Sequence, residues 1–389
     1  MRILVLGSRV PYPLHDGGAV ATYQTLKLLS ENNELVYFTY NTAKHYQSKE
    51  VIKERFPFCK VITQDLDASF NPAKAILALF SGESYNIQRF ISPKANAALA
   101  RLLKKRTFDL VHFEGLYTTP FLETVKANFN GPTLLRQHNI EYQIWEKLAA
   151  TSRGIKKWYL QALSRTLKDY EQNILPKFDQ LVGISPEDTV FLITYNHKAQ
   201  CISVAQELHS PINKLVPYSI CHIGSMEWQP NIQAVKWFVN QVWPQVLAKF
   251  PQAKFHMAGK GLNPRDKQFQ APGIVNHGQV DSASEFMRNY GMMVIPLQSA
   301  SGVRVKALEA MANGLCIVST PVGLSGVAVT NQAKVCDSAQ DMADAIIYLF
   351  QNPQQAHEYG QAAHTFIQQN YSLQALKTQW DQCYSALSQ

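Results

Sequence analysis

Short apolar runs alternate with amphipathic segments along the first half of the chain. Runs of the kind that form buried parallel strands occupy residues 2–7, 34–40, 109–113, 132–136 and 180–184. Apolar residues at helical spacing lie between these runs, most clearly in the stretch 153–173. Ser185 and Pro186, followed by two acids, predict the start of a further helix. The first half is therefore predicted to alternate strands with helices.

A second alternating series follows a polar stretch at 206–218, where Pro211 and Pro217 predict an interdomain linker. Strands are predicted at 221–224, 254–258, 291–296 and 315–319, and helices at 230–247, 354–369 and 373–387. Ser282 and Ser338 have the pattern of helix caps. The two series predict the α/β class, with two doubly wound parallel-sheet (Rossmann-like) domains at 1–205 and 219–372. Ligands bind beyond the carboxyl ends of such strands, so two facing domains are expected to form a cleft.

The chain of 389 residues has a net charge of +8, most of it in the first half. Residues 1–200 hold 25 Lys and Arg against 18 Asp and Glu, whereas residues 201–389 hold 12 against 11. A basic first half suits a polyanion, an anionic membrane surface or a phosphorylated substrate, although a solvated surface explains it equally well. Six widely spaced Cys without a CxxC pair favour a reducing cytoplasm over disulfides or a zinc site. No apolar run reaches the roughly 18–20 residues that a membrane-spanning helix needs.

The segment 296–314 carries the most specific chemistry. A predicted strand ends at Pro296, and a loop of small residues leads into a helix. Arg304 and Lys306 fall in its first turn, and Glu309 follows one turn later. Backbone N–H groups at a helix start favour phosphate, whereas two cations there oppose the helix dipole unless an anion binds. Because carboxylates such as Glu309 accept hydrogen bonds from ribose hydroxyls, the segment predicts a nucleoside diphosphate site rather than a solvated charged face.

Further candidates follow predicted strands in the first half. Gly17 and Gly18 come after the first strand and would expose N–H groups at a helix start, although a plain tight turn explains them as well. His138 follows the strand 132–136, where a cleft residue is expected, with an ordinary structural histidine as the alternative. The acceptor-side candidates are Asp16, His112 and Glu114. The chain has no GxGxxG, GxSxG, HExxH or Walker A motif.

With these motifs the chain resembles a glycosyltransferase of the GT-B fold, in the large family four of retaining, nucleotide-sugar-dependent enzymes. The resemblance covers nearly the whole chain and rests on the segments 17–18, 138–142, 224–231, 259–261, 278–280 and 302–314. It implies a donor site formed by Gly17, Gly18, Gly224, Ser225, Gly259, Lys260, Val280, Ser301, Gly302, Val303 and Glu309. It also implies that Arg304 and Lys306 bind the diphosphate, and that His138 contacts the donor sugar or assists transfer.

Two positions depart from the family pattern. The acid expected eight residues before Glu309 is Ser301 here, so the family's hydrogen bonds from that acid to the donor sugar are in question. The segment 224–231 lacks the Arg and Lys that often follow the first strand of the second domain, and Arg304 with Lys306 resembles their substitute. The resemblance further implies that the last helix, about 373–387, crosses back onto the N-terminal domain.

The resemblance implies transfer of a sugar from a nucleoside-diphosphate sugar to an acceptor hydroxyl with retention, by attack on the face that the diphosphate leaves. Fixed cations and helix N–H groups would stabilise the departing diphosphate, so neither a metal nor another cofactor is expected. The basic segments 104–106 and 153–168 fit an acceptor held in a membrane through a lipid phosphate. We therefore expect a cytoplasmic enzyme, peripheral at the inner face of the membrane, in capsule, exopolysaccharide or lipopolysaccharide assembly, with a soluble acceptor as the alternative.

Three alternatives stay open at this point. Another GT-B enzyme, such as a nucleotide-sugar epimerase, needs carboxylates in its cleft, and Ser301 weakens that interpretation. A nucleotide-sugar-binding partner without catalysis would keep the phosphate site and tolerate Ser301. A nucleic-acid binder explains the basic half but leaves Lys306 and Glu309 without a role, so nucleic acid is not expected as a partner.

Overall fold

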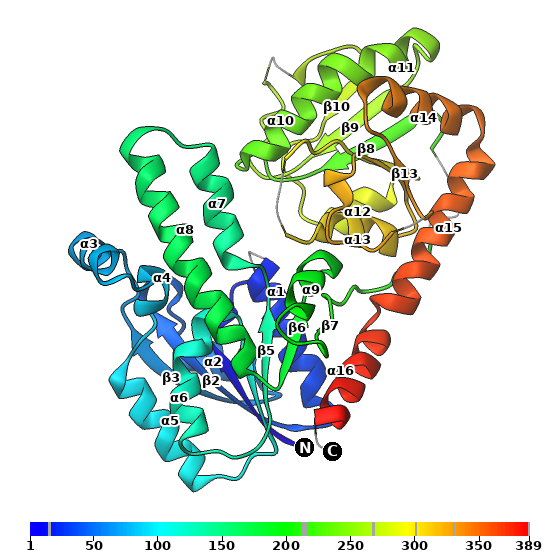
Figure 1. Ribbon diagram of the computed structural model, residues 1–389. Coiled ribbons are helices and arrows are strands. Elements are labelled where there is room, and N and C mark those ends of the chain that lie inside the picture. Colours follow the sequence, from blue (N-terminus) through cyan, green and yellow to red (C-terminus); the bar gives the residue numbers. More distant parts are fainter. Residues whose placement is uncertain (15–16, 212–215, 267–268, 300–301, 330, 388–389) are drawn as a thin grey trace. The chain divides into compact units, whose positions relative to one another are not determined.

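A computed structural model describes the whole chain except residues 15–16, 212–215, 267–268, 300–301, 330 and 388–389 (Figure 1). The chain forms two compact units, one made of Met1–Val204 with Lys377–Gln389 and the other of Ala205–Leu376. Each unit is built on a parallel sheet of its own. None of the described helices is both long enough and apolar enough to cross a membrane.

The first unit contains a seven-stranded sheet in the order β3-β2-β1-β4-β5-β6-β7. Its strands are β1 (Arg2–Gly7), β2 (Glu34–Thr42), β3 (Lys60–Leu66), β4 (Leu110–Glu114), β5 (Thr133–Gln137), β6 (Gln180–Gly183) and β7 (Gln200–Cys201). The parallel register places Gly7 beside Glu114, and Glu114 beside Arg136. The carboxyl ends of β1, β4 and β5 therefore lie together, at the edge of the sheet where ligands bind in such folds.

Helices cover both faces of this sheet (Figure 1). They are α1 (Gly17–Ser30), α2 (Lys49–Arg55), α3 (Pro72–Ser81), α4 (Tyr85–Gln88), α5 (Pro93–Lys105), α6 (Leu122–Lys126), α7 (Glu141–Ala150), α8 (Gly154–Ile174), α9 (Pro186–Ile193) and α16 (Leu373–Leu387). On one face, strand residues such as Leu4 and Val111 pack against α5, α6 and α8. On the other, Trp380 and Tyr384 of α16 contact His112 of β4. The alternation along β4 thus buries His112 under the last helix.

The second unit contains a six-stranded sheet in the order β10-β9-β8-β11-β12-β13. Its strands are β8 (Ser219–Ile223), β9 (Lys254–Ala258), β10 (Ile274–Asn276), β11 (Met292–Ile295), β12 (Cys316–Ser319) and β13 (Lys334–Val335). The register places Ile223 beside Ala258, and Ile295 beside Ser319. The loops that follow β8 and β9 therefore start side by side at the carboxyl edge of the sheet.

Two apolar clusters hold the helices of the second unit against its sheet. These helices are α10 (Gln229–Trp237), α11 (Trp243–Lys249), α12 (Ala283–Arg288), α13 (Val305–Ala312), α14 (Ala339–Gln351) and α15 (Pro353–Asn370). The helix predicted at 230–247 is divided, because a π-helical turn at Phe238–Val242 separates α10 from α11. The small residues of α13, including Ala307 and Ala310, are fully buried, which lets this helix lie close to the sheet.

The predicted α/β class with two parallel sheets is confirmed. Every predicted strand is present with ends within two residues of the prediction, and Ser185, Ser282 and Ser338 each accept a hydrogen bond from the N–H three residues later. The apolar pattern of the sequence does not predict four strands that lie at the sheet edges, β3, β7, β10 and β13. These strands are only partly buried, so they lack the continuous apolar run that marks a central parallel strand.

Candidate functional site

Two glycines shape the carboxyl edge of the second sheet. Gly224 follows β8 directly and donates its N–H to the carbonyl of Ala258, while the Gly259 N–H donates to Gly278. Any side chain at Gly259 would collide with the carbonyl of Gly224, and its φ of +149° also favours glycine. The backbone of Met226 bonds to Lys260 at 2.7 Å. These contacts fix the two loops, including Ser225, against each other.

Lys306 of α13 reaches this pair of loops. Its Nζ donates to Oδ1 of Asn231 at 2.8 Å, and Nδ2 of Asn231 donates to the Ser225 carbonyl at 2.9 Å. A methyl group built on Gly224 would lie 2.8 Å from Nζ of Lys306, so the loop glycine leaves room for the ammonium. Burial, together with the nearby charge of Arg304, lowers the pKa of Lys306 to about 7. In the free protein this desolvated amine is therefore partly neutral, and a bound anion would favour its protonated form.

Arg304 stands immediately before α13 and is almost fully buried. Its Nε donates to the Val322 carbonyl at 3.2 Å, in the segment that follows β12. Two cationic side chains thus meet at the N-terminal end of an eight-residue helix, where the helix dipole already contributes partial positive charge. This arrangement concentrates positive potential at one spot, and a bound anion would relieve the repulsion.

Glu309 lies one turn further along α13 and is partly buried. Burial raises the pKa of this carboxyl, and among the described residues no side chain donates a hydrogen bond to it. A desolvated carboxylate without a donor is costly unless a ligand supplies hydroxyl groups. In a nucleoside diphosphate the ribose follows the phosphates. Two cations for the phosphates, followed along the helix by Glu309 for the ribose, match this order.

The remaining donor-side candidates of the second unit differ in their surroundings. Gly302 has a φ of +80°, and Val303 packs against Gly326. Lys260 forms an exposed ion pair with Glu227 at 3.0 Å, so its charge is already partly compensated. Val280 packs on the apolar cluster around α12 and α13. Ser301 lies outside the described residues.

In the first unit, the carboxylate of Glu114 is shared by two side chains from β5 and its end. Nε2 of His138 lies 2.8 Å from Oε2, and Nη1 of Arg136 lies 3.1 Å from Oε1. Burial raises the pKa of Glu114, but Arg136 and then His138 outweigh it and hold the pKa well below its usual range. An ionised carboxylate only accepts, so Nε2 of His138 carries the proton. The His138 side chain is 17% exposed against 1% for Glu114, so the histidine alone is open to a ligand.

Arg136 is fully buried and ties this carboxylate to distant parts of the unit. Its Nη1 also donates to Thr25 of α1 at 2.6 Å, and its Nη2 donates to the carbonyls of Ile202 and Ser203. Its guanidinium lies 5.4 Å from the ring centre of Trp380 in α16. Arg136 was not among the predicted site residues, although a basic residue inside the apolar run 132–136 is a usable signal of a buried ion pair.

A second buried carboxylate fixes the segment around His138. Glu171 of α8 accepts hydrogen bonds from Nε2 of Gln137 at 2.9 Å and from the N–H groups of Glu141 and Tyr142 at 3.1 Å each. It therefore caps the start of α7 and holds both flanks of His138. Nothing in the local sequence pattern points to this role, because Glu171 lies about thirty residues away from its partners.

The structure corrects the expectation for His112. Its side chain has no exposed surface, because the ring packs 5.2 Å from Trp380 and its Nδ1 hydrogen-bonds the Tyr384 hydroxyl at 2.7 Å. Burial lowers the pKa of His112 to about 4. His112 is thus an interior residue that ties α16 to the sheet and does not face an acceptor.

The glycine pair in the first unit lies at a helix start, as expected. Helix α1 begins at Gly17, and no atom lies within 4 Å of the place where a Gly17 side chain would begin. Gly18 is the second residue of the same helix. Asp16 lies outside the described residues, so the acceptor-side prediction there stays a prediction.

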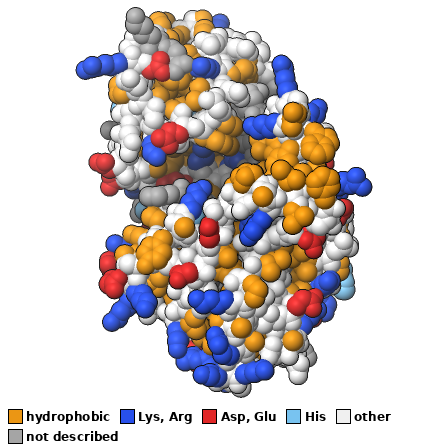
Figure 2. Space-filling view, turned by 90° about the vertical axis from the view of Figure 1, so that its left-hand side faces the viewer, with side chains coloured by type: hydrophobic (Ala, Val, Ile, Leu, Met, Phe, Trp, Pro, Cys, Tyr) orange, Lys and Arg blue, Asp and Glu red, His pale blue; other side chains and the backbone are white. Residues whose placement is uncertain are grey.

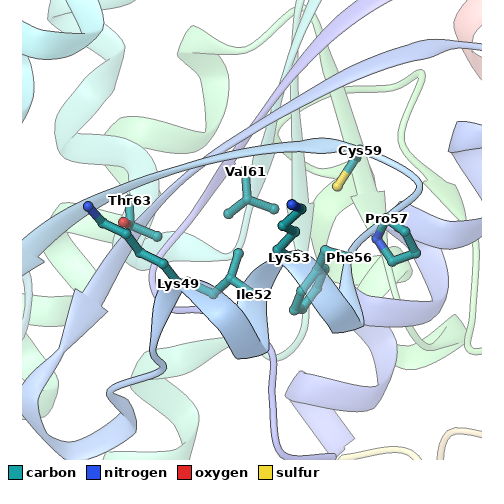
Figure 3. A pocket seen from close by; sticks show the side chains of 8 residues that line it. All are labelled: Lys49, Ile52, Lys53, Phe56, Pro57, Cys59, Val61 and Thr63. Atoms are coloured by element: carbon teal, nitrogen blue, oxygen red, sulfur yellow. The ribbon is translucent and has the colours of Figure 1, made fainter.

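A pocket in the first unit lies apart from these clusters (Figure 3). It is lined by Lys49, Ile52, Lys53, Phe56, Pro57, Cys59, Val61 and Thr63, from α2, β3 and the loop between them. Burial raises the pKa of the Cys59 thiol to about 12, so this thiol is unreactive at neutral pH. None of the described candidates for donor or acceptor binding lines it. Within the described part of the chain, no group of three or more His, Cys, Asp or Glu side chains is placed to hold a metal ion.

Known proteins resemble this chain in sequence and in fold. Residues 217–352 match the family model described as Glycosyl transferases group 1. A 44.6 kDa protein from the cps region of Klebsiella pneumoniae is 24% identical over 398 residues, which cover 95% of this chain and 96% of the relative. The match spans both units of the chain.

Solved structures match the whole chain at low identity. Sucrose-phosphate synthase from Thermosynechococcus elongatus has a TM-score of 0.64 at 15% identity, covering 100% of this chain and 99% of that one. HepE from Anabaena, in complex with UDP, has a TM-score of 0.66 at 12% identity and covers 99% of this chain and 100% of its own. TarM from S. aureus has a TM-score of 0.66 at 12% identity, with 98% of each chain covered.

The two parallel sheets and the match to these solved structures give the chain the GT-B fold, and its second unit matches the Glycosyl transferases group 1 family model. The cluster formed by Arg304, Lys306 and Glu309 lies inside the matched region 217–352. The chain carries a Glycosyl transferases group 1 domain there, so the resemblance to glycosyltransferases is confirmed.

Proposed function

We propose that the protein transfers a sugar from a nucleoside-diphosphate sugar to an acceptor hydroxyl, with retention of anomeric configuration and without a metal. The observation that carries the proposal is the group at the start of α13: desolvated Lys306, buried Arg304, and Glu309, to which no side chain of the described residues donates a hydrogen bond. The second unit then binds the donor, with Glu309 accepting from the ribose hydroxyls. HepE, a structural neighbour, is solved in complex with UDP and with UDP-glucose, which supports uridine nucleotides as the first probes.

The proposed reaction follows from where charge develops. As the bond from the anomeric carbon to the diphosphate oxygen breaks, negative charge grows on the departing diphosphate. Arg304 and Lys306, placed at the N-terminal end of α13, stabilise that charge more in the transition state than in the ground state. The acceptor oxygen bonds to the anomeric carbon on the same face, and its proton passes to the departing phosphate oxygen. In this scheme, the cations of the chain supply the stabilisation that a metal gives elsewhere.

The first unit is proposed to serve the acceptor and the sugar. His138 is held by Glu114 with its Nε2 proton fixed, which leaves Nδ1 for a ligand. The relative from the cps region of Klebsiella pneumoniae supports a role in capsule or a related cell-surface polysaccharide. An acceptor of this kind is built on a lipid carrier, so we propose a cytoplasmic enzyme that works at the membrane surface.

A turnover assay with a matched control tests the proposal. The full chain is incubated with UDP-, GDP- and ADP-sugars, and release of the nucleoside diphosphate is followed with and without a lipid-linked acceptor. Turnover should fall by at least about a hundredfold in Arg304→Met/Lys306→Met, the scale of losing a preorganised charge stabiliser. It should persist in Lys254→Met, which removes an exposed cation at the opposite edge of the same sheet. Equal turnover in both variants would contradict the phosphate assignment, and an inverted anomer in the product would contradict retention.

A further inference from the structure

Helix α3 exposes an apolar side that none of the described residues of its own unit covers. Its inner face buries Ala75 and Ala78 against α4, α7 and α8. The outer face presents Ile76, Leu77 and Phe80, and the Phe80 side chain is 86% exposed. Phe70, just before the helix, is exposed as well. Folding alone does not account for large apolar side chains gathered on one side of a short helix.

The start of α8 adds a second exposed apolar edge next to the first. Ile155 is 86% exposed and Trp158 63% exposed, one helical turn apart. Tyr159, the next residue, packs into the cluster that contains Ala75 and Ala78 of α3, so the two exposed edges adjoin. We call Phe70, Ile76, Leu77, Phe80, Ile155 and Trp158 the α3–α8 patch. Figure 2 shows hydrophobic side chains gathered beside Lys and Arg side chains on the face that α3 and α8 present.

The charges around the patch are mostly positive. The segments 70–83 and 153–158 contain four basic residues, Lys74, Arg153, Lys156 and Lys157, and one acid, Glu83. All four basic side chains are exposed. Protein–protein interfaces are poor in lysine, whereas a surface with Trp, Phe and Leu beside Lys and Arg suits the boundary between lipid headgroups and acyl chains. The partner that matches this chemistry is an anionic lipid surface.

We propose that the α3–α8 patch docks the protein on a membrane containing anionic lipids. The apolar side chains enter the headgroup region, and Lys74, Arg153, Lys156 and Lys157 pair with lipid phosphates. This inference deepens the proposed function by naming the surface on which a lipid-linked acceptor is met. It does not depend on turnover, because docking is measured without donor or acceptor.

Vesicle sedimentation of the full chain tests the docking. Wild type should bind vesicles of equal parts phosphatidylcholine and phosphatidylglycerol at least about tenfold more tightly than phosphatidylcholine alone. The variants Leu77→Ser/Phe80→Ser and Ile155→Ser/Trp158→Ser should each weaken binding by about tenfold or more. Lys156→Gln/Lys157→Gln should weaken binding to the anionic vesicles by a similar factor. A blue shift of tryptophan fluorescence on binding, reduced in Trp158→Phe, should report insertion.

A matched control is available on α9 of the same unit, where Val190 and Ile193 are exposed apolar residues outside the patch. Val190→Ser/Ile193→Ser should bind vesicles as wild type does. Equal binding by wild type and both serine pairs of the patch would overturn the proposal. The proposal would also be overturned if the wild-type chain did not bind vesicles but formed a dimer that the serine pairs dissociate.

Two further readouts separate this inference from the proposed function. The exposed positions of the patch predict that the serine pairs keep the wild-type melting temperature and nucleotide-induced stabilisation, so loss of vesicle binding is not loss of fold. If vesicles bind through the patch while no nucleotide stabilises the chain, the docking stands and the proposed transfer fails. If nucleotides bind and vesicles do not, the docking alone fails.

Discussion

Donor binding should draw a proton onto Lys306. Burial and the neighbouring charge of Arg304 lower the pKa of Lys306 to about 7, so this side chain is about half neutral in the free protein at neutral pH. A diphosphate beside Nζ favours the charged form and should return its pKa toward the ordinary value near 10.4. The protonated form is the one that binds, and it is lost from the free protein as the pH rises through about 7. Affinity should therefore be highest below pH 7 and decline above it.

The size of the effect follows from the pKa shift. Between pH 7 and pH 9 the protonated share of free Lys306 falls from about one half to about one hundredth, so the dissociation constant should rise roughly fiftyfold. That factor corresponds to about 2.3 kcal/mol. At pH 8 the complex should take up about 0.9 proton for each nucleotide bound.

Calorimetric titration measures both quantities. A nucleotide sugar that binds is titrated into the full chain at pH 7, 8 and 9, in buffers that differ in ionisation enthalpy, so that proton uptake is read from the difference in heat. Lys306→Met should bind more weakly at pH 7 and lose this steep pH dependence. A dissociation constant that stays flat from pH 7 to pH 9, or an equal slope in Lys306→Met, would refute the reasoning.

Three further predictions concern other parts of the two clusters. Arg136→Met leaves the carboxylate of Glu114 buried without its main partner and should lower the free energy of unfolding, measured by urea titration, by about 3–5 kcal/mol. Adding Glu114→Gln should recover part of this loss. If it recovers none, the ion pair is not the cause of the loss. Glu309→Gln should weaken nucleoside diphosphate binding by roughly tenfold while leaving inorganic pyrophosphate binding unchanged, and an equal loss for both ligands would exclude a ribose contact. His138→Gln should lower kcat at least about tenfold with the nucleotide dissociation constant unchanged, and a loss confined to nucleotide affinity would place His138 elsewhere.

The central strands and the helix caps could be predicted from the sequence because their signals are local. The strand 254–258 and the helix 373–387 have the predicted bounds, since each is marked by its own apolar pattern. The edge strand β3 could not be predicted in this way, because none of its residues is fully buried and its apolar run is interrupted. Helix α3 has an apolar pattern, but no local signal separates a buried apolar face from an exposed one.

The candidate site could be predicted only where its residues lie close together in the sequence. Arg304, Lys306 and Glu309 lie within six residues, so their spacing alone indicated a phosphate and ribose site. Asn231, which orients Lys306, comes from another helix 75 residues away. The partners of Arg136 come from α1, from β4 and from the segment that follows β7, so only tertiary structure brings them together. His112 was misplaced for the same reason, because the helix that buries it lies 272 residues later.

Hydrogen exchange with mass spectrometry tests the central claim most directly, because it locates the bound nucleotide on the full chain without any acceptor. The nucleoside diphosphate that stabilises the chain most in a thermal-shift screen is the ligand. We predict slower exchange in peptides covering 224–231, 258–261 and 302–312, with no such change in Arg304→Met/Lys306→Met. If exchange in these three segments is unchanged and exchange slows instead around the pocket at 49–63, the donor site proposed for the second unit is contradicted.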